Sequence, residues 1–270
     1  MKTIPILFNT EMVQAILDGR KTVTRRLLKP QPTFPGYPEG VTGRPVRCDD
    51  GSWCFDMTPF AYACEGSYKP PCEPGDILYV RETWRVQAAH RFEADARIEF
   101  KAGGQMVTIQ FPGRCSDSHE RPTYDEFIGK WGVSGKWRPS LHMPKEAARI
   151  FLRVKDVRVE RLQDITVDQA AAEGIDSMVP SNDAEELCNY CPLPDEAKGV
   201  RCYGGTVHMC EGSRCGEAMD SWEEEYLSEF SGLWNSTIKP ADIPTYGWDA
   251  NPYVWVIEFE KISKEEAVKC

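Results

Sequence analysis

The sequence lacks the features that would place the chain in or across a membrane. Its longest strongly apolar segments are strand-sized, far short of the run of about 20 apolar residues that a membrane helix needs. The apolar start of the chain is too short and too soon interrupted to be a signal peptide. No internal repeat is visible either. We therefore expect a cytoplasmic protein with no membrane partner.

Basic residues are also fewer than acidic ones. The chain has 32 Lys and Arg against 42 Asp and Glu, which gives a formal net charge of −10. Proteins that coat DNA or RNA are normally basic, so this balance argues against that class. It leaves room for a local basic pocket that holds one nucleotide or one phosphate, because the basic residues cluster at 20–29 and 130–161. Nothing in the sequence indicates a protein partner.

A disulfide framework is not indicated, because the 11 cysteines are odd in number and come without a secretory signal. Metal binding is the first alternative. Residues 177–217 have little hydrophobic periodicity, and their cysteines have the spacing of paired zinc knuckles. We predict a structural zinc ion that orders this segment, with unbound reduced thiols as the alternative. The predicted ligands are Cys188, Cys191, Cys210 and Cys215, for one of which Cys202 or His208 could substitute.

The composition that is present, 41% hydrophobic and 11% aromatic, is ordinary for a globular protein. We assign residues 1–176 and 218–262 to one domain, residues 177–217 to a cysteine-rich insertion, and residues 263–270 to a solvated tail. Alternating apolar residues predict strands at 3–8, 76–84, 93–101, 105–111 and 253–262, a hairpin at 45–56, and a strand pair at 150–159 with a bulge or tight turn at 155–156. Helices are predicted at 10–18 with Thr10 as N-cap, at 167–173 with a Thr166–Gln169 capping box, and from Asp220 onward. Residues 30–44, 112–135 and 239–250 are predicted to be loops.

One short basic stretch, residues 19–26, is the first candidate site. Gly19 falls where a helix ends in a left-handed residue, and the chain then enters a strand. A lysine beside a hydroxyl on such a rigid junction indicates an anion site or an activated nucleophile. A solvated basic turn is the alternative. The residues concerned are Gly19, Arg20, Lys21, Thr24, Arg25 and Arg26.

A second candidate is Glu82, a carboxylate at the end of an otherwise apolar strand. It is either a strand end that emerges into solvent or an acid that lines a cleft. Further along, the irregular segment 137–144 is punctuated by proline and carries Arg138 and His142.

These residues carry a resemblance to a known family. Gly19-x-Lys21-x4-Arg26 after a helix, with Pro74-Gly75-Asp76 leading into the strand that ends at Glu82, resembles the signature of the ASCH family. Later blocks resemble a phage- and prophage-encoded branch of that family, at residues 137–144, 158–165, 172–175, 233–236 and 251–259. The resemblance covers most of the chain apart from 30–70, 101–130 and 177–217.

The resemblance implies an α+β fold, a PUA-like mixed β-barrel with flanking helices, and a cleft lined by the signature. It also implies binding of RNA or of a modified nucleoside. One small bacterial member is an amidohydrolase that removes the acetyl group from 4-acetylcytidine. Its catalytic residue types are matched here by Lys21, Thr24 and Glu82.

The chemistry of these residues is compatible with that reaction. Lys21, with its pKa lowered by neighbouring arginines, could take a proton from Thr24 or from a water, and Glu82 could pass it to the leaving amine. Arg26 or a backbone amide could hold the oxyanion. Trp84 or Trp137 could stack on a base, although a tryptophan is more often core. Gly19, Arg20, Arg25, Arg138 and His142 complete the predicted substrate cleft. A module that binds RNA or a modified base without chemistry, and a ribonuclease, are the alternatives.

Overall fold

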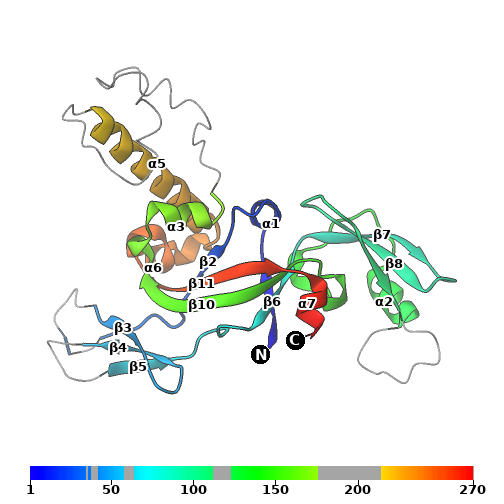
Figure 1. The fold of residues 1–270 in the computed structure, drawn as a ribbon, viewed down its shortest axis with the longest axis horizontal. Helices are drawn as coiled ribbons and strands as arrows, with labels where there is room; N and C mark the ends of the chain where they lie inside the picture. Colours follow the sequence, from blue (N-terminus) through cyan, green and yellow to red (C-terminus); the bar gives the residue numbers. More distant parts are fainter. Residues whose placement is uncertain (35, 38–41, 58–63, 112–122, 176–213, 270) are drawn as a thin grey trace.

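A five-stranded mixed sheet forms the middle of the molecule (Figure 1). The computed structural model describes residues 1–34, 36–37, 42–57, 64–111, 123–175 and 214–269. The strand order is β1-β6-β10-β11-β2, with β1 and β6 parallel and the other neighbours antiparallel. The strands are β1 (Thr3–Leu7), β6 (Ile77–Arg81), β10 (Phe151–Arg161), β11 (Tyr253–Ile262) and β2 (Val23–Leu27). The expected α+β fold of sheets with flanking helices is confirmed.

The expected barrel is not formed by the described residues, because the edge strands β1 and β2 do not pair with each other. A side chain spans the two edges instead: Arg26 Nη2 of β2 donates to the Leu7 carbonyl of β1 at 2.8 Å. Helix α1 (Thr10–Leu17) connects these strands, and its Val13 and Ile16 fill the core beside them. The sheet is therefore curled but open.

Two smaller sheets lie at opposite ends of the molecule in Figure 1. One consists of β3 (Arg44–Arg47), β4 (Trp53–Asp56) and β5 (Cys64–Tyr68), which confirms the predicted hairpin and adds a third strand. The other consists of β7 (Trp84–His90), β8 (Asp95–Phe100) and β9 (Val107–Gln110). Helix α2 (Tyr124–Trp131) packs beside this second sheet, where we predicted a loop, and a Thr123–Glu126 capping box starts it.

The remaining helices flank the β2–β11 edge and the end of the chain. They are α3 (Val167–Ala172), α5 (Arg214–Ser236), α6 (Ile243–Tyr246) and α7 (Lys264–Lys269), with 3-10 turns at Ser140–His142, Lys145–Ala147, Leu162–Asp164, Pro240–Asp242 and Trp248–Ala250. The capping box of α3 is confirmed. Two predictions are wrong: Asp220 lies inside α5 and does not start it, and residues 239–250 are largely helical. The N-cap of α1 is Asn9 rather than Thr10, because the Asn9 side chain accepts from Met12 N.

Strand β6 divides the interior and so positions the candidate residues. Leu78 and Val80 face a core shared with α1, whereas Ile77 and Tyr79 face a core shared with β7–β9. The alternation predicted for this strand is thus confirmed. The irregularity predicted at 155–156 is a β-bulge in a continuous β10, between Val154 and Asp156. No helix in the described ranges is long and apolar enough to cross a membrane.

Candidate functional site

Lys21 is buried and forms an ion pair with Glu173, which we did not predict from the sequence. Its Nζ donates to Glu173 Oε2 at 2.5 Å and to the Glu173 carbonyl at 2.8 Å. Arg25 Nη1 reaches Oε1 of the same carboxylate at 3.2 Å. The Lys21 side chain has no exposed surface. Two cations of the basic stretch therefore share one buried acid.

Two glycine turns bring these groups together. Gly19 has a φ of +80°, as the sequence predicts, and the N–H groups of Arg20 and Lys21 both donate to the Ala15 carbonyl. Gly174 has a φ of +86° at the end of α3, and a Cβ there would lie 2.6 Å from Ala15 Cβ and 2.9 Å from Lys21 Cβ. Only glycine allows α3 to come this close, so Glu173 arrives directly over Lys21.

The burial of Lys21 shifts its pKa. Loss of water lowers the pKa of Lys21, the Glu173 carboxylate opposes that shift, and the charges of Arg26 and Arg25 add to the lowering. The direction is the one we expected, but burial is the leading cause. Arg20 is bound elsewhere, to the Gly174 carbonyl at 3.1 Å and to Asp18 at 3.2 Å.

Glu82 is buried rather than exposed to solvent, with 1% of its surface accessible. Arg149 holds it in a bidentate pair, with Nε to Oε1 and Nη2 to Oε2 both at 2.8 Å. Burial raises the pKa of Glu82, and Arg149 opposes the rise. The guanidinium of Arg149 lies 4.1 Å from the centre of the Phe100 ring, and the glycine at position 104 leaves it room. Sequence reasoning missed Arg149, which is 67 residues from its partner.

Lys21 and Glu82 have different ion-pair partners but a shared neighbour, Phe8. The Phe8 N–H donates to the Arg81 carbonyl at 3.2 Å, so Phe8 adjoins the strand end that carries Glu82. Lys21 Nζ lies 5.7 Å from the centre of the Phe8 ring, and Arg26 Cζ lies 5.2 Å from it. Thr24 is also buried, on β2 opposite Ile257. Lys21 and Arg26 thus both lie beside Phe8, while the carboxylate bound to Lys21 is Glu173.

The predicted stacking residue Trp84 is core. It is fully buried against Phe127 and Trp131, so in this structure neither face of its ring is open to a base. Its backbone pairs with that of Arg138, whose guanidinium binds the Trp131 carbonyl and lies 5.4 Å from the Trp131 ring centre. Arg138 therefore fixes the end of α2. The exposed Trp137 lies under Arg85, at 4.4 Å.

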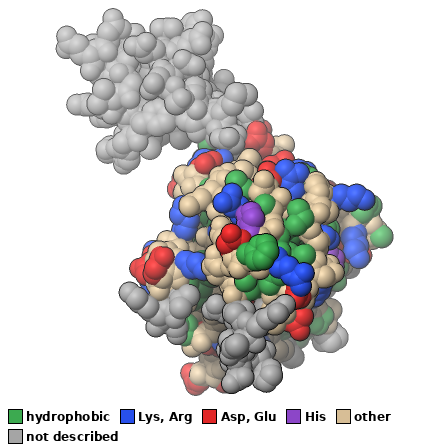
Figure 2. All heavy atoms as spheres, turned by 90° about the vertical axis from the view of Figure 1, so that its right-hand side faces the viewer, with side chains coloured by type: hydrophobic (Ala, Val, Ile, Leu, Met, Phe, Trp, Pro, Cys, Tyr) green, Lys and Arg blue, Asp and Glu red, His purple; other side chains and the backbone are tan. Residues whose placement is uncertain are grey.

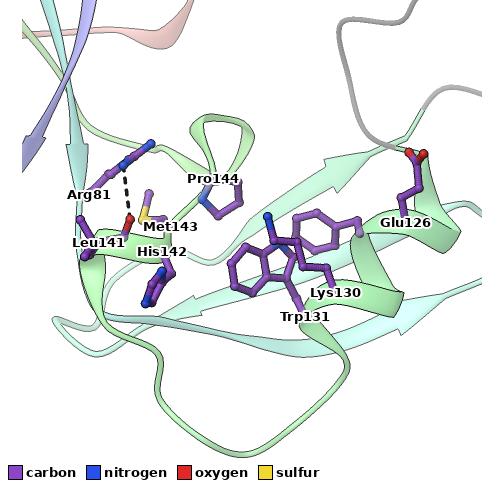
Figure 3. Close-up of a pocket in the computed structure, with 9 residues that line it drawn as sticks. Arg81, Glu126, Lys130, Trp131, Leu141, His142, Met143 and Pro144 are labelled. Atoms are coloured by element: carbon purple, nitrogen blue, oxygen red, sulfur yellow. Dashed lines mark hydrogen bonds between the residues drawn. The ribbon is translucent and has the colours of Figure 1, made fainter.

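His142 lines a cavity of about 470 Å³ between α2 and the segment 141–144 (Figure 3). Lys130 and Trp131 project from α2, and Met143 and Pro144 face them from the other wall (Figure 3). Glu82 adjoins this wall, because its N–H contacts Met143 Sδ at 3.3 Å. Figure 2 views this end of the molecule, where hydrophobic side chains gather beside a histidine and several Lys and Arg side chains. We did not predict from the sequence that Arg81, Lys130 and Trp131 line a cavity.

The zinc prediction falls largely outside the described residues. Cys188, Cys191 and Cys210, with the substitutes Cys202 and His208, lie in 176–213, and Cys215 lies in α5 without a described side chain. Within the ranges that the structure does describe, no group of three or more His, Cys, Asp or Glu could hold a metal ion.

No family model, curated protein or solved structure matches this chain. The function therefore has to be inferred from the residues and their geometry.

Proposed function

We propose that this chain is an ASCH-like, PUA-like protein that binds RNA or a modified nucleoside. The observation that supports this best is the cavity beside Glu82. Its volume of about 470 Å³ lies within the range of about 300–1,000 Å³ typical of small-molecule sites. One wall offers the ring of Trp131 and the others offer apolar side chains and cations, which suits a base and its sugar.

Binding can be measured directly with the whole chain. Cytidine, 4-acetylcytidine and a short single-stranded RNA are titrated while the tryptophan fluorescence or the heat of binding is followed. We expect saturable binding of at least one of them, weakened about tenfold or more by Trp131→Leu, because base–aromatic stacking contributes about 1–3 kcal/mol. The matched control is Trp137→Leu, at an exposed tryptophan that does not line the cavity. Absence of binding by all three ligands would overturn the proposal.

Amide hydrolysis of an N-acetylated cytidine is the second candidate, and the lowered pKa of Lys21 favours it. A lysine whose pKa is lowered gives up its proton more readily and can then act as a base toward Thr24 or a water. Turnover requires Lys21 to leave Glu173 or to pass its proton to that carboxylate, since Glu173 Oε2 is the acceptor 2.5 Å away. Glu82 would have to exchange its pair with Arg149 for the leaving amine.

This second candidate has its own test. Wild-type protein incubated with 4-acetylcytidine should release cytidine and acetate, and Lys21→Met should abolish the release. Lys136→Met, at an exposed lysine, is the control for an unchanged rate. If wild-type protein binds 4-acetylcytidine and releases no cytidine, the chain is a binding module only.

A further inference from the structure

The cavity between α2 and residues 141–144 carries two positive charges that no acid neutralises within the described ranges. Arg81 Nη1 donates to the Leu141 carbonyl at 3.3 Å and Nη2 to the Tyr79 hydroxyl at 3.1 Å, and both acceptors are neutral. Lys130 has no carboxylate within 4.0 Å among the described residues, and its Nζ lies 4.9 Å from the centre of the Trp131 ring. A charge fixed by neutral partners keeps its attraction for an anion.

The acid that lines the cavity, Glu126, is hydrogen-bonded to Thr123. Glu126 Oε2 accepts from Thr123 N at 2.8 Å and from Thr123 Oγ1 at 3.0 Å, which caps the first turn of α2. In Figure 3 its carboxylate lies at the far end of that helix from Arg81 and His142. Arg81, Lys130 and Glu126 give the lining a formal charge of +1, in a chain of −10. The cavity is thus locally basic on an acidic protein.

The end of α2 would ordinarily repel an anion, because the last carbonyls of a helix carry partial negative charge. Here the Arg138 guanidinium binds the Trp131 carbonyl and covers that end. The Trp131 ring meets Trp84 edge to face, with centroids 5.2 Å apart, so its orientation is set by the core behind it. The Lys130 ammonium, on a flexible stem, lies over this fixed ring at the cavity.

We propose that this cavity binds the phosphate of a nucleotide as well as its base, and so recognises a nucleoside monophosphate, free or at the end of an RNA strand. The phosphate lies between Arg81 and Lys130, and the base takes the place over the Trp131 ring that the flexible Lys130 ammonium leaves when it pairs with that phosphate. This inference rests on the proposed nucleoside or RNA binding and adds to it that the phosphate is required for tight binding.

The test compares cytidine, cytidine 5′-monophosphate and inorganic phosphate by titration calorimetry with the full chain. We expect the monophosphate to bind at least tenfold more tightly than cytidine. Lys130→Gln should remove most of that ratio, and this exposed side chain can be replaced without disturbing the fold. Arg81→Gln should have the same effect, and Lys136→Gln, at an exposed lysine outside the cavity, should preserve the ratio.

The possible outcomes separate this inference from the proposed function. Equal affinities for cytidine and its monophosphate, or a ratio that survives Lys130→Gln, would refute the phosphate site and leave nucleoside binding standing. Failure of cytidine, 4-acetylcytidine and RNA to bind would refute both. A 5′-phosphorylated trinucleotide that binds more tightly than the monophosphate identifies an RNA end as the ligand, and the reverse order identifies a free nucleotide.

Discussion

The residue that most changes the interpretation of the basic stretch is Glu173. Lys21 lies in the signature, whereas its partner lies 152 residues away, in the block 172–175, where no local pattern indicates what the carboxylate binds. Hydrophobic periodicity and capping motifs report on neighbours within one or two turns, so they could predict α3 and its Gly174 stop but not what the end of α3 binds. Arg149 escaped sequence reasoning for the same reason.

Removal of the Glu173 charge should be costly. Glu173→Gln leaves Lys21 and Arg25 buried without their shared acid, and breaking a buried pair in this way typically costs about 3–5 kcal/mol. We expect a loss of that order in the free energy of unfolding, measured by denaturant titration. Lys21→Met combined with Glu173→Gln should cost less than the sum of the two single changes. As a control, Glu93→Gln, at an exposed acid, should change stability by less than about 0.5 kcal/mol; an equally small change for Glu173→Gln would contradict the buried network.

The raised pKa of Glu82 predicts a pH dependence with a definite sign. A carboxyl whose folded pKa lies above its ordinary value of 4.5 binds its proton more tightly when folded than when unfolded. Its contribution to stability is complete below the unfolded pKa and is lost as pH rises through the folded pKa. Glu82→Gln removes this term, so the unfolding free energy of wild type minus that of the variant should fall as pH rises from about 4. A difference that grows over the same range would show that Arg149 outweighs burial.

At the scale of elements, glycine conformation decides how α1 and α3 meet. Gly174→Ala would combine a φ of +86° with Cβ contacts of 2.6 Å and 2.9 Å, whereas Gly103→Ala has a similar φ of +76° and nothing within 4 Å. The Gly103 variant should lose about 1–2 kcal/mol from backbone strain alone. The Gly174 variant should lose a further ~1–3 kcal/mol from overpacking, measured by thermal unfolding. Equal losses would mean that α3 can move away from Lys21.

Several elements could be predicted because each carries its own local signal, as in the alternation of β6 and the Thr166–Gln169 box of α3. Helix α2 had such a signal as well, in Thr123 and Glu126, but its polar composition favoured a loop. Strand β5 had none, since Cys-Glu-Gly-Ser-Tyr lacks alternating apolar residues. The cavity depends on α2, so it could not be predicted once that helix was missed.

At the scale of the whole molecule, three sheets lie in a row along the long axis of Figure 1, and β6 separates two cores. The signature residues around Phe8 and the cavity of Trp131 lie at one end of this strand, joined through Arg81 and Glu82. The acidic total charge of −10 opposes binding along a polymer, so recognition is expected to involve one or two nucleotides.

Metal content is also a property of the whole chain. The cysteine spacing predicts about one zinc ion per chain by elemental analysis of the purified protein, and its loss when Cys188 and Cys191 are both changed to Ser. Cys72→Ala is the control, because Cys72 lies in the core and burial raises its pKa to about 12, so it stays a thiol. Wild-type protein without zinc would refute the prediction.

The contact between Arg26 and Leu7 has a mechanical consequence. Backbone ladders resist slippage, because a shift of one residue turns every side chain to the opposite face. A guanidinium on a flexible stem can release and rebind without any such reversal. Among the residues that the structure describes, one side-chain hydrogen bond joins the two edge strands of the curled sheet. We therefore expect the amides along the outer edge of β1 to exchange with solvent before those of the inner strands of the sheet.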